Sequence, residues 1–402
     1  MNSDLNSTPA ASRIHIGFFG SRNAGKSSLV NAITGQEIAV VSDVLGTTTD
    51  PVFKAMELLP VGPVEIIDTP GFDDDGKLGE LRVNKTKQIL NKTDIAVLVV
   101  NAKDGKNEYD EQLISLFKEK GLPYIIVYNK SDIKEIICNN DNEISVSAKD
   151  NHNIFELKEK IAAYAKQNES NKRLIADLIE KNELIVLVIP IDSSAPKGRL
   201  ILPQQQTIRD ILDSDACAIC VKDTEYKTLL NTLGKKPGLV VCDSQAFAKV
   251  NEETPTDIPL TSFSILFARM KGDLRTVVEG VRAIDKLSDG DIVLISEGCT
   301  HHRQCEDIGT VKLPKWLKKY TGKDINFEFS SGTSFCDDFS KYKMIIHCGG
   351  CMLNEKEMKY RQKTAKDNNI PITNYGIAIA YMNGILKRST GIFPELEGIF
   401  KD

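Results

Sequence analysis

Short β-branched runs alternate with amphipathic helical stretches over residues 13–168. Strand and helix runs repeated in this order predict βαβ units and a mostly parallel sheet. The predicted strands cover residues 14–19, 65–67, 95–100, 124–128 and 143–146, and a final helix covers 153–166. Residues 1–12 precede the pattern as a tail, and the polar stretch 167–172 predicts a boundary after it.

The same alternation continues through residues 176–262 and 263–402. In the first of these segments the predicted strands cover 184–189, 216–221 and 239–242; in the second they cover 291–296, 325–329, 344–347 and 371–374. The pattern predicts a small α/β domain followed by a doubly wound α/β domain. A unit of about 80 residues has a marginal core, so we expect residues 176–262 to dimerise and the protein to be a homodimer.

The composition narrows the class of protein. The chain has 402 residues, 41% hydrophobic and 27% charged, which suits two or three globular domains and excludes disordered and fibrous chains. With 51 basic and 56 acidic side chains the formal net charge is -5, so we expect no nucleic-acid partner. No apolar run approaches the ~20 residues of a membrane span, and there is no signal-peptide pattern. We therefore expect a cytoplasmic protein with no membrane partner.

The clearest chemical motif is Gly20-Ser21-Arg22-Asn23-Ala24-Gly25-Lys26-Ser27. It follows a predicted strand and precedes an apolar helical run, as a phosphate-binding P-loop does. Its glycines let backbone N–H groups curl around phosphate, Lys26 supplies a charge, and Ser27 holds Mg²⁺. The predicted nucleotide-binding residues here are Gly20, Asn23, Ala24, Gly25, Lys26, Ser27 and Ser28.

Three later motifs predict that the nucleotide is GTP. Asp68-Thr69-Pro70-Gly71 closes a strand, where Asp68 reaches the Mg²⁺ shell and the Gly71 N–H reaches the γ-phosphate. Asn129-Lys130-Ser131-Asp132 follows another strand, and a carboxylate at Asp132 accepts hydrogen bonds from the N1–H and N2 amine of guanine. Ser147-Ala148-Lys149 presents a backbone N–H to guanine O6.

Residues 13 to about 165 resemble the translation-factor-like GTPases, in particular the group that contains MnmE, Era and EngA. The resemblance implies that Thr48 completes the Mg²⁺ shell in the GTP state, so that the catalytic residues are Lys26, Thr48 and Gly71. Asn23 matches the asparagine that helps bind K⁺ in potassium-activated members; the alternative is a side chain that only satisfies its own loop. Phe72 stands where Ras-like proteins carry a water-orienting glutamine, so we expect slow hydrolysis stimulated by K⁺.

Cysteines form the second informative constellation. Nine cysteines without an export signal indicate reduced thiols or metal ligands. Cys299-Thr300-His301 and His347-Cys348-Gly349-Gly350-Cys351 each follow a predicted strand, and neighbouring parallel strands would bring both segments to one sheet edge. Three thiolates suit a 4Fe-4S cluster with one open iron, which His301 or His347 could fill. Cys₃His zinc and unliganded buried thiols are the alternatives. Cys217 and Cys220 lie in a predicted strand and are expected to be core residues.

A GTPase head followed by this cysteine pattern resembles the HydF family, the iron-only (FeFe) hydrogenase maturation GTPases. The resemblance implies a P-loop GTPase domain (13–168), a small dimerisation domain (176–262) and a cluster-binding domain (263–402), with Cys299, Cys348 and Cys351 as the ligands of a 4Fe-4S cluster. It also implies a carrier that receives a diiron precursor from the radical-SAM maturases HydE and HydG and delivers it to the apo-hydrogenase. A zinc-stabilised regulatory GTPase and a tRNA-modification-type GTPase remain as alternatives.

Overall fold

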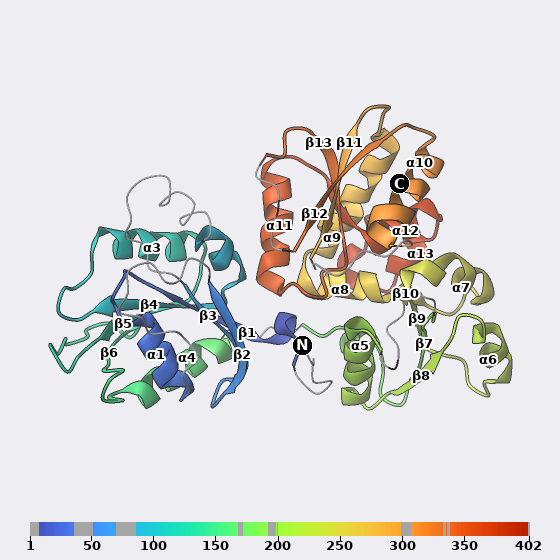
Figure 1. Ribbon diagram of the computed structural model, residues 1–402. Coiled ribbons are helices and arrows are strands. Elements are labelled where there is room, and N and C mark those ends of the chain that lie inside the picture. The colour runs from blue at the N-terminus through green and yellow to red at the C-terminus, as the bar shows by residue number, and fades with distance from the viewer. Residues whose placement is uncertain are drawn as a thin grey trace. The chain divides into compact units, whose positions relative to one another are not determined.

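The chain divides into two units, residues 1–170 and 171–402, each of which is described by itself (Figure 1). The computed structural model describes the following residues: 8–35, 51–69, 86–167, 172–191, 198, 200–298, 307–332, 335 and 338–400. Within these ranges no helix is long and apolar enough to cross a membrane.

The first unit contains a six-stranded sheet in the order β2-β3-β1-β4-β5-β6. Its strands are β1 (Ile14–Phe19), β2 (Val52–Leu58), β3 (Gly62–Asp68), β4 (Ile95–Asn101), β5 (Tyr124–Asn129) and β6 (Glu143–Ser145). All neighbours pair in parallel except β2, which runs antiparallel to β3. The predicted βαβ series is confirmed. The sequence pattern missed β2 because this edge strand is mostly exposed and lacks the apolar run of its neighbours.

Helices cover both faces of this sheet. They are α1 (Lys26–Thr34), α3 (Glu108–Glu119) and α4 (Ile154–Gln167), with a further helical stretch at 86–92. The side chains of β4 alternate strictly: Ile95, Val97 and Val99 pack with α1 and α4, whereas Ala96, Leu98 and Val100 pack with α3. Two cores on opposite faces make the central strands apolar at every position, which is why they could be predicted.

The second unit begins with a parallel sheet in the order β10-β9-β7-β8. Its strands are β7 (Leu184–Val188), β8 (Cys217–Val221), β9 (Leu239–Cys242) and β10 (Leu260–Ser262), and its helices are α5 (Leu202–Asp213), α6 (Tyr226–Thr232) and α7 (Phe247–Glu253). The expectation that Cys217 and Cys220 are core residues is wrong. Both are exposed. Strand β8 lies at the edge of the sheet, where its side chains are less covered than those of the inner strand β9.

A second parallel sheet follows, in the order β12-β11-β13-β14. Its strands are β11 (Ile292–Glu297), β12 (Asn326–Ser331), β13 (Tyr342–His347) and β14 (Ile372–Asn374). The α-helices of this part are α8 (Phe263–Lys271), α9 (Leu274–Gly280), α10 (Leu313–Thr321), α11 (Glu355–Asp367), α12 (Tyr375–Met382) and α13 (Leu386–Thr390). The α/β architecture expected from the sequence is therefore confirmed throughout.

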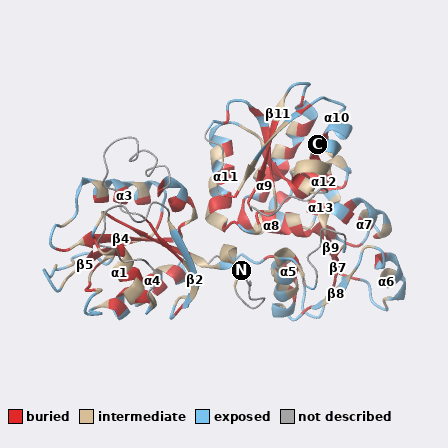
Figure 2. Ribbon diagram, viewed as in Figure 1, coloured by how far each residue is buried: buried red, intermediate tan, exposed pale blue. Residues whose placement is uncertain are grey.

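The two sheets of the second unit share one hydrophobic core. Val186 and Val240 of the first sheet belong to the same buried cluster as Ile295 and Ile346 of the second. The central strands β7, β9 and β11 are mostly buried (Figure 2). Helix α8 contacts α5 on one side and α11 and α12 on the other. Arg388 of α13 adds hydrogen bonds to the carbonyl oxygens of Thr254, Pro255 and Ile258. This shared core explains why residues 171–402 form one compact unit.

Candidate functional site

The P-loop joins β1 to α1 and wraps around the Lys26 side chain. The buried Lys26 Nζ donates to the carbonyl oxygens of Gly20 and Ser21, both at 2.8 Å. Gly20 has φ +136°, and a Cβ there would collide with the carbonyl oxygen of Val99 in β4. The loop is therefore folded tightly against the sheet, with a buried cation at the N-terminus of α1. Phosphate oxygens are the natural partners of such a cation.

A magnesium position is indicated beside the loop. Ser27 Oγ donates to Asp68 Oδ2 at 2.8 Å, while the buried Oδ1 of Asp68 has no hydrogen-bond partner among the described residues. Burial raises the pKa of Asp68 against the effect of Ser27 and Lys26. An unsatisfied carboxylate oxygen next to a serine hydroxyl suits Mg²⁺, which prefers oxygen ligands. Thr48, expected to complete the Mg²⁺ shell, and Gly71, expected to bind the γ-phosphate, lie outside the described residues.

The two predicted guanine-binding motifs lie at the carboxyl ends of β5 and β6, and Asn129 connects them to the P-loop. Asn129 Nδ2 donates to Ala24 O at 3.1 Å, and its Oδ1 accepts from the Ala148 N–H at 3.1 Å. Lys130 Nζ donates to Asn23 O at 2.8 Å. Asn129 thus ties together the loop that binds phosphate and the Ser147-Ala148-Lys149 segment.

The predicted base-recognition carboxylate is accessible. Ser147 Oγ donates to Asp132 Oδ1 at 3.0 Å, which fixes the orientation of a side chain that is itself exposed. Lys149 is also exposed and Ser28 is half-buried. The arrangement leaves acceptor positions on Asp132 for the two donors of a guanine edge.

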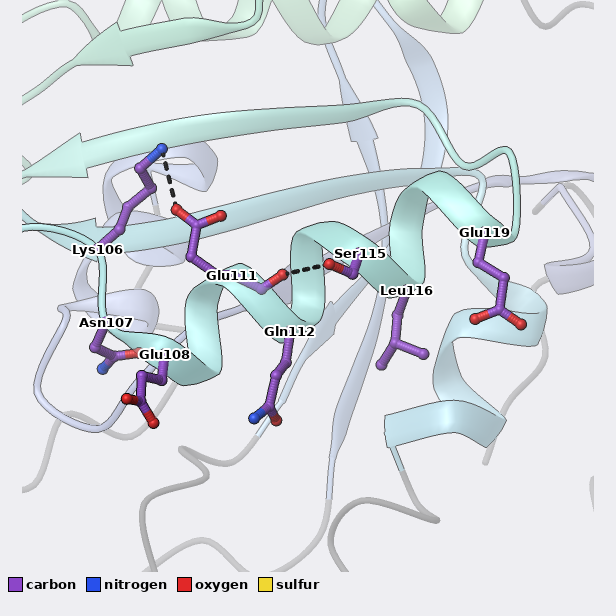
Figure 3. Close-up of a pocket in the computed structure, with 8 residues that line it drawn as sticks. All are labelled: Lys106, Asn107, Glu108, Glu111, Gln112, Ser115, Leu116 and Glu119. Atoms are coloured by element: carbon purple, nitrogen blue, oxygen red, sulfur yellow. Dashed lines mark hydrogen bonds and ion pairs between the residues drawn. The ribbon is translucent and has the colours of Figure 1, made fainter.

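Helix α3 supports the P-loop through contacts that the sequence did not reveal. Asn107 and Asp110 form a capping box at its N-terminus, and Asn107 Nδ2 also donates to Ser21 Oγ at 2.6 Å. The Asn-x-x-Asp spacing signals a helix start but not the partner across the fold. A surface hollow of about 830 Å³ lies along α3. Figure 3 shows the residues that line it, among them the ion pair between Lys106 and Glu111. Its remaining charged residues, Glu108 and Glu119, would repel phosphate.

The cysteine segment lies at the carboxyl edge of the second sheet. As expected, β11 and β13 are parallel neighbours. The Cys348 N–H donates to Ser296 O at 2.8 Å, and the Gly298 N–H donates to Cys348 Sγ at 3.1 Å. The Gly350 N–H points to the same sulfur at 3.4 Å. Two N–H donors aimed at one sulfur favour a thiolate and are typical of the surroundings of cluster sulfurs.

Only some of the predicted metal ligands lie among the described residues of this region. Burial, opposed by the N–H groups of Gly298 and Gly350, raises the pKa of Cys348 to about 11, and burial also raises that of Cys351. Bound metal deprotonates such thiols. Cys299 and His301 lie outside the described residues. Within those residues, no group of three His, Cys, Asp or Glu side chains is placed to hold a metal ion.

His347 is engaged at both ring nitrogens. The Arg361 guanidinium donates to Nε2 at 2.9 Å, so the proton resides on Nδ1, which donates to the Cys348 carbonyl oxygen at 2.8 Å. Arg361 is fully buried and also bonds Glu357 and Gly332 O. Burial, helped by Arg361, lowers the pKa of His347 to about 3. In this arrangement the imidazole supports the backbone at Cys348 and presents no lone pair to a metal.

Family models match three consecutive parts of the chain. The model for a 50S ribosome-binding GTPase matches residues 15–130, the hydrogen maturase F dimerization domain matches 174–272, and the hydrogen maturase F tetramerization domain matches 275–392. The chain belongs to the HydF family. Its first unit is a P-loop GTPase domain, and its second unit carries the two HydF oligomerization domains.

Two curated relatives are GTPases that match less than half of this HydF chain. GTPase Der of Campylobacter jejuni is 41% identical over 126 residues, which are 31% of this chain and 27% of that protein. The tRNA modification GTPase MnmE of Dechloromonas aromatica is 29% identical over 171 residues, 41% of this chain and 38% of that protein. The chain thus spans between a quarter and two fifths of the length of these relatives. The solved structure of Aquifex aeolicus Era has 19% identity and a TM-score of 0.34, and the match covers 55% of this chain and 98% of that one.

Proposed function

We propose that this HydF chain is a cytoplasmic GTPase that binds a 4Fe-4S cluster and carries a diiron precursor to apo-FeFe-hydrogenase. HydE and HydG would supply the precursor, and the chain would work as a homodimer or a higher oligomer. The observation that carries the proposal is the double N–H donation to Cys348 Sγ, one donor being Gly298, which immediately precedes Cys299. It supports a common site for residues 299, 348 and 351.

In the GTPase domain each residue has a separate task. Lys26 leaves the carbonyl oxygens of Gly20 and Ser21 and pairs with the β- and γ-phosphates. Ser27, Asp68 and Thr48 hold Mg²⁺, while the Gly71 N–H binds the γ-phosphate. Since Phe72 cannot orient water, Asn23 would help to hold K⁺, which would supply additional stabilisation of the transition-state charge. Hydrolysis is therefore slow and faster in K⁺ than in Na⁺.

In the second unit Cys299, Cys348 and Cys351 hold the cluster. The cluster would supply an iron with a coordination position open to an exchangeable ligand or to the cargo. Gly298 and Gly350 donate to the sulfur of Cys348, and His347 holds the backbone next to it. The fourth ligand is left to His301 or to a group from outside the chain.

Metal analysis of anaerobically purified Cys348→Ala protein tests the cluster. We expect wild-type protein to be brown, with broad absorption near ~400 nm and bound iron and sulfide. Cys348→Ala loses the iron and keeps its GTP turnover, whereas the matched control Cys220→Ala, a change at an exposed cysteine, keeps both. Colourless wild-type protein with stoichiometric zinc would refute the carrier function.

Base recognition is tested at Asp132. An amide at this position offers a donor where guanine also offers one, so Asp132→Asn weakens GTP binding by about 100-fold and gains affinity for xanthosine triphosphate. Turnover of wild-type protein in KCl and in NaCl tests the cation. Equal rates in the two salts would remove K⁺ from the proposal without affecting the assignment of Asp132.

A further inference from the structure

A buried lysine lies against the cysteine turn and comes from a different part of the chain. Lys271 is the last residue of α8 and is only 5% exposed. Its Nζ donates to the carbonyl oxygens of Gly350 at 3.0 Å, Cys351 at 3.0 Å and Leu353 at 2.6 Å. One ammonium group therefore uses three donors on a single turn, and it fixes the direction of three peptide planes around Cys351.

The charge of Lys271 has no carboxylate counterpart in the described part of the chain. Buried ammonium groups normally lie beside a carboxylate, because an unpaired buried charge is unfavourable. The acidic groups that interact with this one are the thiols of Cys351 and Cys348, and its aromatic neighbour is Phe267, with Nζ 5.6 Å from the ring centre. Among the described residues, the acidic groups that act on this cation beside the turn are therefore the two cysteine thiols.

Both sides of this contact are held rigidly. Gly350 has φ +65°, and a Cβ there would lie 2.7 Å from Met358 Sδ, so the turn is packed against α11. The end of α8 is fixed as well, since the Asp273 N–H donates to Gln362 Oε1 of α11 at 2.8 Å. The turn and the end of α8 are therefore both packed against α11.

We infer that Lys271 is a positioning residue for metal binding: it holds residues 348–353 in the ligating conformation and compensates the negative charge of cysteine-bound iron. The inference rests on the proposed function. Lys271 lies within the segment matched by the dimerization model, and the turn lies within the segment matched by the tetramerization model. Metal binding in one family domain thus depends on a side chain of the other.

The test compares Lys271→Met and Lys271→Arg in the full-length chain. In metal-free protein, Lys271→Met loses three charge-assisted hydrogen bonds, so amide exchange in residues 348–353 becomes at least about tenfold faster. After anaerobic reconstitution this variant retains less than half of the wild-type iron. Iron that remains has a more negative reduction potential, because a positive charge beside it is lost. Lys271→Arg restores part of each property.

Lys343→Met is the matched control, because Lys343 is exposed on β13 and the substitution is the same. We expect wild-type exchange and iron content for it. If Lys271→Met does not fold, Lys271→Gln, which keeps a donor, replaces it.

Two outcomes separate this inference from the proposed function. If the wild type binds iron and Lys271→Met changes neither exchange nor iron content nor potential, the inference is wrong and the carrier function stands. If the wild type takes up no iron and Lys271→Met still accelerates exchange, the carrier function and the charge compensation are wrong, and only the role of Lys271 in holding residues 348–353 stands.

Discussion

The two units each contain a buried lysine whose ammonium group binds backbone carbonyls of a glycine-containing turn. In the first unit Lys26 binds Gly20 O and Ser21 O; in the second, Lys271 binds the oxygens of Gly350, Cys351 and Leu353. Lys26 belongs to the turn that it organises, whereas Lys271 comes from 79 residues before Gly350. The first site can therefore be recognised from a local sequence motif, whereas the second forms only when α8 packs against α11.

The two lysines also differ in their electrostatic setting. Lys26 is the first residue of α1, and Lys271 is the last residue of α8. A helix N-terminus is positive, so Lys26 and α1 together attract an anion strongly enough to draw the ammonium from its carbonyl partners. A helix C-terminus is negative and stabilises a cation where it is. We conclude that Lys26 is placed to change partners and Lys271 is placed to keep them.

Exchanging Lys26 for methionine gives the largest effect expected from this comparison. Lys26→Met removes a positive charge that the P-loop is expected to direct at the transferring phosphoryl group, and GTP hydrolysis falls by about 10²–10³-fold. Iron content and amide exchange in residues 348–353 stay at wild-type values, in contrast to Lys271→Met. A phosphate-release assay beside metal analysis measures both.

Lys118→Met serves as the control for Lys26→Met, since Lys118 is exposed in α3. We expect it to leave both properties unchanged. Retention of wild-type turnover by Lys26→Met would contradict the role assigned to the P-loop lysine.

Much of the fold could be predicted because central parallel strands are apolar on both faces. The alternation of Ile95, Val97 and Val99 with Ala96, Leu98 and Val100 fills two cores at once, so the strand stands out as a continuous run. The edge strand β2 and the short strand β10 carry no such signal. Cys217 and Cys220 show the opposite error, because an apolar run on an edge strand is still exposed.

The candidate sites follow the same division. The residues predicted to bind phosphate and guanine lie in short motifs, so their spacing alone was enough to predict them. The supports of the cysteine turn could not be predicted in this way, because Lys271 reaches Gly350 and Arg361 reaches Gly332 over long stretches of chain. Buried cations of this kind depend on tertiary structure, and only their individual contacts reveal them.

Arg361 extends the comparison to a buried cation that has a carboxylate partner. It pairs with Glu357 at 2.9 Å within α11, and both side chains are almost completely buried. Arg361→Met leaves that carboxylate without its charged partner and removes the support of His347, so we expect a loss of about 3–5 kcal/mol in the free energy of unfolding of the second unit. Denaturant unfolding followed by the fluorescence of Trp316, the single tryptophan, reports on this unit.

The same helix provides the matched control for Arg361→Met. Lys359 and Glu355 form another i,i+4 pair at 2.7 Å, but there the lysine is 56% exposed. Lys359→Met should change the free energy of unfolding by less than about 0.5 kcal/mol. Equal effects of the two substitutions would mean that burial does not determine the importance of these cations.

His15 is a fourth buried cation, and its charge depends on pH. It lies in β1 between Glu65 at 3.0 Å and Asp94 at 3.4 Å. Burial lowers its pKa, but the hydrogen bonds and charges of Asp94 and Glu65 outweigh this and raise the pKa to about 9 from 6.5. The nearby cations Lys92 and Arg13 also help to lower the pKa of Glu65.

The folded-state pKa of His15 is therefore higher than the unfolded one, so its contribution to stability is complete below pH ~6.5 and is lost as the pH rises through ~9. The contribution is on the order of 3 kcal/mol. Amide exchange in β1, measured during thermal unfolding of the first unit, should show that the stability of this unit declines over this pH window. His15→Gln should abolish the decline. His152→Gln, at an exposed histidine, should leave the decline intact. A decline that persists in His15→Gln would assign it to other groups. The result would also sharpen the contrast with Lys26 and Lys271, because a cation held by carboxylates is stabilised by charge, whereas one held by carbonyl oxygens depends on their fixed geometry.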